Sequence, residues 1–439
     1  MSDYLYTLES HLNAAQSRAL AIVQETATEA GLNVFLAGGA LRDMVAGFPI
    51  RDLDFVVEGN ATALAKVIAK KAEAEILTVD ARRNSVELLF PQNAQVELSM
   101  AREEKYPKSG GKPTITPATI YEDLKNRDFT INAIAMSLNR ASRGLLIDPN
   151  NGLGDIERKE LRTVSKYTLY DDPVRILRLI RFAKRFQFSI NESTLTQYSN
   201  VRDANLERKI GPDALRRELH HIADEPTSAE IVKELDDQGL LTLFCPAMVG
   251  DKVNHAGLQK LLKARMNIPI ELNLPVENIG LFLTVLCEKL TPKEKAGLKT
   301  ACALDKPTLT AWDRLDARAK KVAAELKVPK LAKPSLLYAA AQRTEGAELV
   351  YLLYKSTERL VQDRIKNYVQ KYLPAALEVT NEEVTEATNL EPGSAKFEKA
   401  KAVFIAKKLD ARPKKIVEEM PLVPPAPQHP PLVASARRG

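Results

Sequence analysis

The chain has 439 residues, of which 45% are hydrophobic and 27% are charged, and both values are ordinary for a globular protein. Its length exceeds the size at which one hydrophobic core stops growing, so two to four domains are expected. No segment reaches the roughly 18 uninterrupted apolar residues of a membrane span, and the start of the chain lacks the pattern of a signal peptide. A cytoplasmic protein without a membrane partner is therefore expected.

Three cysteines, Cys245, Cys287 and Cys302, are scattered along the chain without the spacing of metal ligands. An odd number cannot all pair, which fits a reducing compartment. Basic residues exceed acidic ones by 63 to 57, a net charge of +6 that by itself favours a nucleic-acid partner only weakly.

A basic stretch lies between residues 395 and 415, where only Glu398 and Asp410 are acidic. Two interpretations stay open: a solvated helix face, or a surface that contacts RNA phosphates. Under the second, Lys407, Lys408, Lys414 and Lys415 are candidate RNA-binding residues. The cationic residues of the stretch are Lys396, Lys399, Lys401, Lys407, Lys408, Arg412, Lys414 and Lys415.

The first 150 residues mix helix and strand patterns. Helical spacing over 10–30 is followed by an apolar run at 33–37 that ends at Gly38-Gly39, which predicts a helix, a strand and a tight glycine turn. These elements predict a small mixed α/β domain that ends near residue 150. The elements expected next are helices at 40–47 and 61–71 and strands at 52–57, 75–79, 85–90 and 94–99.

Beyond residue 156 the strand patterns thin out and helical periodicity continues, as in 173–186, 214–222 and 229–240. The fold class is therefore α+β, with a small mixed-sheet domain followed by an all-helical remainder. A loop is expected over 380–393. The last nineteen residues, 421–439, contain six prolines and predict an extended or disordered tail.

The strongest chemical signal is GGALRD at 38–43 followed by RDLDF at 51–55. Alternate residues of a strand face the same side, so Asp52 and Asp54 place two carboxylates together. Like charges this close need a cation, and hard oxygen ligands suit Mg²⁺. Gly38 and Gly39 let backbone N–H groups approach a triphosphate, and Arg42 adds a phosphate contact. Their order and spacing favour a nucleotidyl-transfer site over a solvated strand.

A second motif, EDLKNRDFTINA at 122–133, runs from charged residues into an apolar segment. Taken alone it could describe a capped helix with Asp128 or Thr130 near the N-cap. Beside the first motif, Arg127 becomes a candidate to bind triphosphate and Asp128 a candidate to bind ribose, because a guanidinium fits phosphate and a carboxylate accepts from sugar hydroxyls.

A third motif, DDPVRILRLIRF at 171–182, places Asp172 and Arg175 three residues apart. A carboxylate beside a guanidinium is complementary to the donor and acceptor edges of cytosine and adenine, whereas guanine and uracil reverse that order. The alternative is structural: Pro173 suits the first position of a helix, which would make Asp172 or Asp171 an N-cap.

With these three motifs in order, residues 30–245 resemble the bacterial tRNA nucleotidyltransferase and poly(A) polymerase family, the class II branch of the polymerase-β-like superfamily. The resemblance implies a nucleotidyltransferase head (1–150), a nucleotide-selecting neck (151–245), a body and tail that hold tRNA (246–420), and a proline-rich end (421–439). These four names are kept below for the segments. It also implies that Glu97 is a further catalytic carboxylate, with an outward strand glutamate as the alternative, and that 102–106 starts a flexible loop.

The implied activity is addition of CMP and/or AMP, from CTP and ATP, to the tRNA 3′ end by two-metal chemistry, with the acceptor and TΨC region as the RNA partner and no DNA. A poly(A) polymerase, an A-adding enzyme and a CC-adding enzyme share these motifs and remain open. The loop between Glu97 and Asp123 argues against an enzyme that adds only CC. A catalytically inactive RNA-binding relative is the alternative of another class, and the intact pair Asp52 and Asp54 argues against it.

Overall fold

A computed structural model describes residues 3–269, 272, 274 and 276–411. In the head, the described residues form a seven-stranded mixed sheet in the order β3-β4-β5-β2-β1-β8-β9 and a separate hairpin of β6 and β7. Within the main sheet β2 and β5 are parallel and the other neighbours are antiparallel. The strands are β1 (Asn33–Ala37), β2 (Leu53–Glu58), β3 (Glu75–Asp80), β4 (Ser85–Phe90), β5 (Ala94–Met100), β6 (Arg102–Lys105), β7 (Thr114–Pro117), β8 (Ala135–Ser137) and β9 (Leu146–Ile147).

Side chains alternate between the two faces of this sheet, and each face has its own apolar cluster. One face carries Leu36 and Phe55 toward α2 and α4, while the other carries Phe35 and Val56 toward α5. The central strands β1 and β2 are therefore buried on both sides, whereas the edge strand β3 is exposed. The helices of the head are α1 (Asp3–His11), α2 (Ala14–Glu29), α3 (Gly39–Val45), α4 (Ala61–Ala72) and α5 (Ile120–Lys125).

The helix predicted over 10–30 is confirmed over 14–29, but its start is displaced, because α1 ends at His11 and α2 begins at Ala14. Asn13 caps α2, since its side chain accepts from the backbone N–H of Gln16 and the Gln16 side chain accepts from the N–H of Asn13. The predicted strands at 33–37, 52–57, 75–79, 85–90 and 94–99 are confirmed to within a residue at each end.

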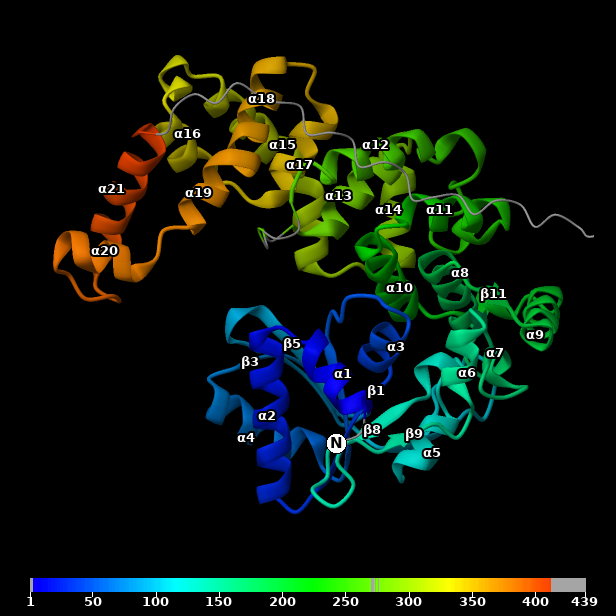
Figure 1. Cartoon of the computed structure of the whole chain (residues 1–439). Coiled ribbons are helices and arrows are strands. Elements are labelled where there is room, and N and C mark those ends of the chain that lie inside the picture. The colour runs from blue at the N-terminus through cyan, green and yellow to red at the C-terminus, as the bar shows by residue number, and fades with distance from the viewer. Residues whose placement is uncertain (1–2, 270–271, 273, 275, 412–439) are drawn as a thin grey trace, which may run out of the picture.

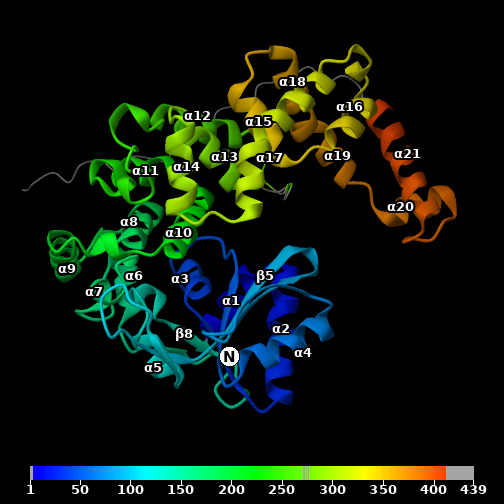
Figure 2. The ribbon, with the colours of Figure 1, turned by 180° about the vertical axis from the view of Figure 1, so that it is seen from behind.

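The neck curves away from the head to one side, as Figure 1 shows, and the view from behind in Figure 2 agrees. Its longest elements are helices, and the two-stranded sheet of β10 and β11 is small. The all-helical remainder predicted from the periodicity is confirmed except for these two short strands. The neck elements are α6 (Gly152–Glu157), β10 (Glu160–Leu161), α7 (Thr168–Asp171), α8 (Arg175–Phe186), β11 (Ser189–Ile190), α9 (Glu192–Asp203), α10 (Pro212–Asp224) and α11 (Ser228–Asp237).

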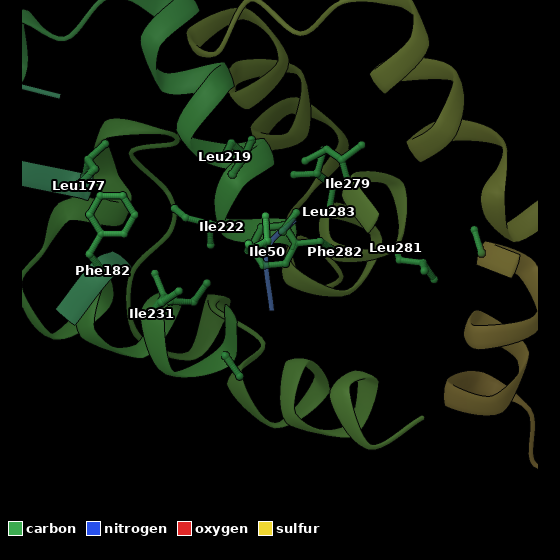
Figure 3. Close-up of a cluster of buried hydrophobic side chains, with 14 of the residues drawn as sticks. Ile50, Leu177, Phe182, Leu219, Ile222, Ile231, Ile279, Leu281, Phe282 and Leu283 are labelled. Carbon is green, nitrogen blue, oxygen red and sulfur yellow. The ribbon is translucent and has the colours of Figure 1, made fainter. Parts of the chain in front are cut away.

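One apolar core runs from the head through the neck into the body. Figure 3 shows the junction, where Ile50 of the head lies among Leu219 and Ile222 of α10 and Phe282 of α13. This continuity fixes the head against the helices that follow it. The body helices are α12 (His255–Arg265), α13 (Asn278–Leu286), α14 (Pro292–Ala301), α15 (Lys306–Leu326), α16 (Pro334–Ala341), α17 (Gly346–Lys355) and α18 (Arg359–Asn367).

The last described helices are α19 (Leu373–Leu377), α20 (Asn381–Thr388) and α21 (Ala395–Ala411), and they surround an apolar cluster of their own that includes Val384, Phe397 and Leu409. The loop predicted over 380–393 is wrong in its first half, because Thr380 and Glu383 form a capping box that starts α20. The predicted disordered tail at 421–439 lies outside the described residues. Within 3–269, 272, 274 and 276–411, no helix is both long and apolar enough to cross a membrane.

Candidate active site

The carboxylates of the first motif lie at the start of β2, on the surface of the head. Asp54 lies within the strand, and Asp52 immediately precedes it and is exposed. Glu97 of β5 lies directly opposite Asp54 in the parallel register. Burial, and then the charges of Asp52 and Glu97, raise the pKa of Asp54 well above its usual value.

This donor set fits a hard divalent cation. No described residue forms an ion pair with Asp52 or Asp54, and within the described chain no cluster of three His, Cys, Asp or Glu side chains could hold a metal alone. Two carboxylates that share a site with substrate phosphate oxygens are an ordinary arrangement for Mg²⁺. The two aspartates would therefore be the protein ligands, and a nucleotide would complete the coordination.

The glycine turn ends β1 and begins α3, as the sequence predicts. Gly38 has a φ of +72°, which a residue with a side chain rarely adopts. A Cβ at Gly38 would lie 2.7 Å from Nη1 of Arg127, and a Cβ at Gly39 would lie 3.5 Å from Oδ2 of Asp54. Gly38 is therefore favoured by its backbone conformation and by the close approach of Arg127, whereas a Cβ at Gly39 would make only an ordinary contact.

Arg42 is not open to a phosphate in this structure. It is 5% exposed, its Nε donates to Oδ1 of Asp43 at 2.8 Å, and its Nη1 donates to Oδ1 of Asn132 at 2.5 Å. Its guanidinium also lies 4.7 Å from the ring centre of Phe186. Arg42 therefore acts inside the protein, and its positive charge still lowers the pKa of Asp54.

Residues 122–125 of the second motif end α5 and the rest forms a loop, so the capped-helix alternative is wrong because no α-helix begins at Asp128 or Thr130. A short 3₁₀ turn (Thr130–Asn132) follows Asp128, and no side chain caps it. Arg127 donates to the Asp123 carboxylate from Nε at 3.2 Å and from Nη2 at 3.1 Å, and its Nη1 donates to the carbonyl of Asn132 at 3.1 Å. These contacts hold its guanidinium against the glycine turn.

Asp128 is buried and its carboxylate is used within the protein. Oδ1 accepts from the Phe129 N–H at 2.7 Å and from the Asn132 amide at 2.9 Å, and Oδ2 accepts from Nη1 of Arg178 at 3.1 Å. Burial opposes its charge, but Arg178 and then Arg175 lower the pKa of Asp128 to about 2. The group is therefore a charged anchor between head and neck.

In the third motif, Asp172 and Arg175 do lie together, with 4.0 Å between Oδ2 of Asp172 and Nε of Arg175. Arg175 also donates to backbone carbonyls of Asn126 at 3.1 Å and of Arg127 at 3.5 Å. The N-cap alternative is wrong, because α8 begins at Arg175 after Val174 and no side chain caps it, while Asp172 follows the end of α7.

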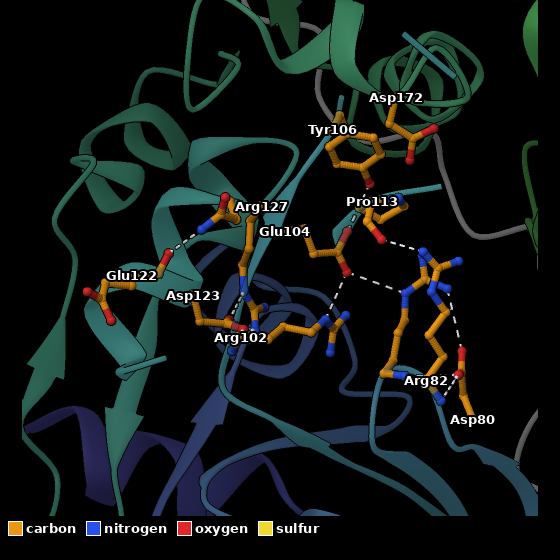
Figure 4. A network of polar contacts seen from close by, with 12 residues as sticks. Asp80, Arg82, Arg102, Glu104, Tyr106, Pro113, Glu122, Asp123, Arg127 and Asp172 are labelled. Atoms are coloured by element: carbon orange, nitrogen blue, oxygen red, sulfur yellow. Dashed lines mark hydrogen bonds and ion pairs between the residues drawn. The ribbon is translucent and has the colours of Figure 1, made fainter. Parts of the chain in front are cut away.

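The hairpin of β6 and β7 reaches over to this pair, as Figure 4 shows for Tyr106 and Asp172. The Tyr106 hydroxyl donates to Oε2 of Glu104 at 2.8 Å, and burial and the charge of Asp172 raise the pKa of Tyr106. Burial opposes ionisation of Glu104, but Arg102 and then Arg83 lower its pKa to about 2. The Gly110 N–H donates to the Asp171 carbonyl at 3.1 Å. The predicted loop after residue 102 is thus an ordered hairpin that contacts the selecting motif.

Several residues of this region escaped the sequence analysis, above all Arg178, Glu218 and Arg185. Arg178 joins Asp128 to Glu218, with its Nε 3.0 Å from Oε1 of Glu218. The available signal was spacing, since arginines at 178, 181 and 185 share one face of α8. Two glutamates contact these arginines: Glu218 of α10 and Glu225, which directly follows the end of that helix.

The described part of the basic stretch, residues 395–411, forms α21, far along the chain from the carboxylates. Lys407 is exposed, and Lys408 lies 3.5 Å from the Glu383 carboxylate of α20. Lys414 and Lys415 lie outside the described residues. A separate cavity of about 450 Å³ lies in the neck, and none of the predicted site residues lines it.

Comparison with known proteins agrees with this geometry. Residues 34–162 match the family described as the poly A polymerase head domain. An A-adding tRNA nucleotidyltransferase of Halalkalibacterium halodurans is 32% identical over 54% of this chain and 56% of its own length. A CC-adding tRNA nucleotidyltransferase of Deinococcus radiodurans is 34% identical over 48% and 54%. The chain thus spans about half the length of these curated relatives.

Among solved structures, the Thermotoga maritima CCA-adding enzyme complexed with tRNA is 22% identical, with a TM-score of 0.52 over 94% of this chain and 96% of that chain. This likeness shows that the fold of that enzyme extends over nearly the whole chain. Residues 34–162 are thus similar to a poly A polymerase head domain. The resemblance of the chain to the tRNA nucleotidyltransferase and poly(A) polymerase family is confirmed.

Proposed function

We propose that the protein is a template-independent nucleotidyltransferase that adds CMP and/or AMP, from CTP and ATP, to the 3′ end of tRNA. One observation carries the proposal: Arg127 joins all three motifs. Its side chain lies against Gly38 of the first motif, while its backbone carbonyl accepts from Arg175 of the third. The carboxylates and the base-selecting pair, more than 100 residues apart in sequence, are thereby parts of one site.

In this proposal Asp52 and Asp54 hold Mg²⁺, which supplies positive charge to the phosphate oxygens when bound. Gly38, Gly39 and Arg127 accommodate the triphosphate, with Arg42 and Asp128 as supports beneath them, and Asp172 and Arg175 select the base. Glu97, opposite Asp54, accepts the proton of the tRNA 3′ hydroxyl. The hydroxyl oxygen bonds to the α-phosphorus, the bond from that phosphorus to the bridging oxygen breaks, and pyrophosphate leaves.

The remaining chain supplies the RNA side of the proposal. The four segments are proposed as domains with the boundaries 1–150, 151–245, 246–420 and 421–439, because the sheet and the carboxylates are confined to the first of them. Lys407 and Lys408, with Lys414 and Lys415, are proposed to contact phosphates of the acceptor and TΨC region. A cytoplasmic location is proposed as well, since Cys245, Cys287 and Cys302 are buried and free.

The test incubates the full-length protein, Mg²⁺ and labelled CTP or ATP with tRNAs that end at the discriminator base, at C or at CC. Addition of three, two or one nucleotides identifies a CCA-, CC- or A-adding enzyme, and a long ladder with ATP identifies a poly(A) polymerase. Asp52→Ala and Asp54→Ala should abolish each product and keep the wild-type circular dichroism spectrum. Absence of any extension by the wild type would leave only the RNA-binding alternative.

A further inference from the structure

Helix α8 is fastened to the head by polar contacts near both of its ends. Near its start, Nη1 of Arg178 lies 3.1 Å from Oδ2 of Asp128. In its last turn, Nη2 of Arg185 lies 2.8 Å from Oδ2 of Asp43. These arginines are seven residues apart, which places them on one face and about 10 Å apart along the helix axis. The same helix begins with Arg175 of the base-selecting pair.

The second fastening point adjoins the glycine turn. Asp43 is 2% exposed, and its other carboxylate oxygen accepts from Nε of Arg42 at 2.8 Å. Nη2 of Arg42 would lie 3.7 Å from a Cβ placed on Gly39, on the side where Oδ2 of Asp54 also lies. Asp43 therefore connects the turn beside the catalytic carboxylates to the far end of α8.

Arg185 forms two ion pairs, one with Asp43 and one with Glu225. Its Nη1 lies 3.5 Å from Oε1 of Glu225, and its guanidinium lies 4.8 Å from the ring centre of Phe186. Burial lowers the pKa of Arg185 to about 10, so the side chain remains charged at neutral pH. A buried arginine without a counter-charge destabilises the fold. The carboxylates of Asp43 and Glu225 supply the counter-charges of Arg185.

We propose that Asp43 is a positioning residue, which through Arg185 sets the tilt of α8 and hence the place of Asp172 and Arg175 relative to Asp52 and Asp54. A helix held to the head only near its start can tilt about that end, whereas a further contact at its other end fixes its direction. Without the contact from Asp43 to Arg185, the hydrogen bonds and ion pairs of α8 with the head are confined to its first turn, at Arg175 and Arg178. The ring of Phe186 still packs against Phe48. The bound base then shifts relative to the attacking hydroxyl, and such displacements of about 1 Å can cost about 100-fold in rate. The inference rests on the proposed nucleotidyl transfer.

A merely stabilising ion pair is the alternative, and the chain offers a matched control. Glu207 is 5% exposed, and Nη1 of Arg202 lies 3.0 Å from its Oε1. Both residues belong to the neck, on α9 and the turn that follows it, so this pair does not join the neck to the head. Glu207→Gln removes a buried ion pair of the same kind. Its effect on Tm and kcat therefore measures the loss of such an ion pair where α8 is not attached to the head.

The experiment compares full-length wild type, Asp43→Asn, Arg185→Gln, Arg185→Lys and Glu207→Gln by Tm, by kcat and by KM for CTP. Asp43→Asn and Arg185→Gln should each lower kcat by roughly 10- to 100-fold while KM for CTP changes by less than about 3-fold. Arg185→Lys keeps a cation beside Asp43 and should recover most of kcat. Glu207→Gln should lower Tm and keep kcat.

A double-mutant cycle sharpens the result. Asp43→Asn and Asp172→Asn alter distant residues, whose effects on kcat would be additive if each acted alone. Since both disturb the placement of the same base, the double variant should lose less than the product of the two single losses. The Arg185 variants decide the case if Asp43→Asn does not fold.

An active wild type whose kcat survives in Asp43→Asn and Arg185→Gln would overturn the positioning role and leave the proposed function standing. Equal kcat losses in these variants and in Glu207→Gln would overturn it too. A wild type that extends no tRNA would overturn both.

Discussion

Nε of Arg175 lies 4.0 Å from Oδ2 of Asp172 and has no hydrogen-bond partner among the described residues, although it is buried. Such an unused donor is costly inside a protein, and a ligand that accepts from it would remove the cost. The other nitrogens of Arg175 donate to backbone carbonyls, which keep the guanidinium plane fixed. A rigid donor beside a free carboxylate is what selection of cytosine and adenine requires.

Asp172→Asn should therefore relax the choice of nucleotide. The asparagine amide can donate to the keto oxygen of uracil or guanine, so UTP and GTP incorporation should rise about 10- to 100-fold relative to CTP and ATP. Since Asp172 caps no helix, Tm should stay within about 2 °C of wild type. The neighbouring Asp171→Asn is the matched control. Unchanged selectivity in a folded Asp172→Asn protein would rule out the selecting role.

The glycine turn provides a second prediction. Gly38→Ala and Gly47→Ala both place a side chain at positive φ, +72° and +76°, so both should lose stability. Gly38→Ala should lose more, because its ψ of −118° lies outside the left-handed helical region. Only at Gly38 does the new Cβ meet another group, Nη1 of Arg127 at 2.7 Å, whereas nothing lies within 4 Å at Gly47. Gly38→Ala should lower kcat/KM for CTP by at least about 10-fold, and Gly47→Ala should not. Equal effects on kinetics would show that Arg127 does not contact the nucleotide.

The buried contact of α8 with α10 predicts a dependence of stability on pH. Burial opposes ionisation of Glu218, but Arg181 and then Arg178 lower its pKa to about 2, below the usual 4.5. The folded form therefore gains stability that is complete above about pH 4.5 and is lost as pH falls toward 2, by roughly 2–4 kcal/mol. Urea unfolding from pH 7 to pH 3 should show this fall. It should be smaller in Glu218→Gln than in the control Glu325→Gln, which alters an exposed residue of α15; equal slopes would contradict the assignment.

A fourth prediction concerns RNA. Lys407→Glu with Lys408→Glu should raise KM for tRNA about 3- to 10-fold at 100 mM salt and leave KM for CTP unchanged, because phosphate contacts are electrostatic. The salt dependence of KM should weaken by about one unit of slope for each lost contact. Lys66→Glu with Lys70→Glu, on the exposed side of α4, is the control of equal charge. A change in KM for CTP instead would place the RNA surface elsewhere.

Local sequence patterns were sufficient for most of the head. The strands and the glycine turn follow from alternation and from Gly38, because each depends on residues close in sequence. Two elements differ from the predicted ones, namely the start of α2 and the helix α20. Both begin at capping boxes, which Asn13 forms with Gln16 and Thr380 forms with Glu383. They show that caps can divide a helical pattern, or start a helix within a polar one.

The site could be predicted only in part, for a different reason. Asp54 and Arg127 belong to motifs whose residue types already indicate chemistry. The contact of Asp43 with Arg185 spans 142 residues, and nothing in either neighbourhood specifies the partner. For the same reason the burial of Arg42 was not foreseen, since Phe186 and Asn132 enclose it only in the folded chain.

The separate apolar cluster around Val384, Phe397 and Leu409 has a consequence for local unfolding of the protein. Head, neck and body share one core, so opening any of them exposes a large apolar surface. Detaching α20 and α21 exposes a much smaller cluster and breaks the contacts of Asp410 with Lys333 and Ser335. Amide hydrogens of α21 should then exchange with solvent much faster than those of α8 or α13. The segment of α20 and α21, part of which is proposed to bind RNA, would therefore open at a lower free energy than the rest of the described chain. A bound tRNA could then displace it while the active site in the head keeps its structure.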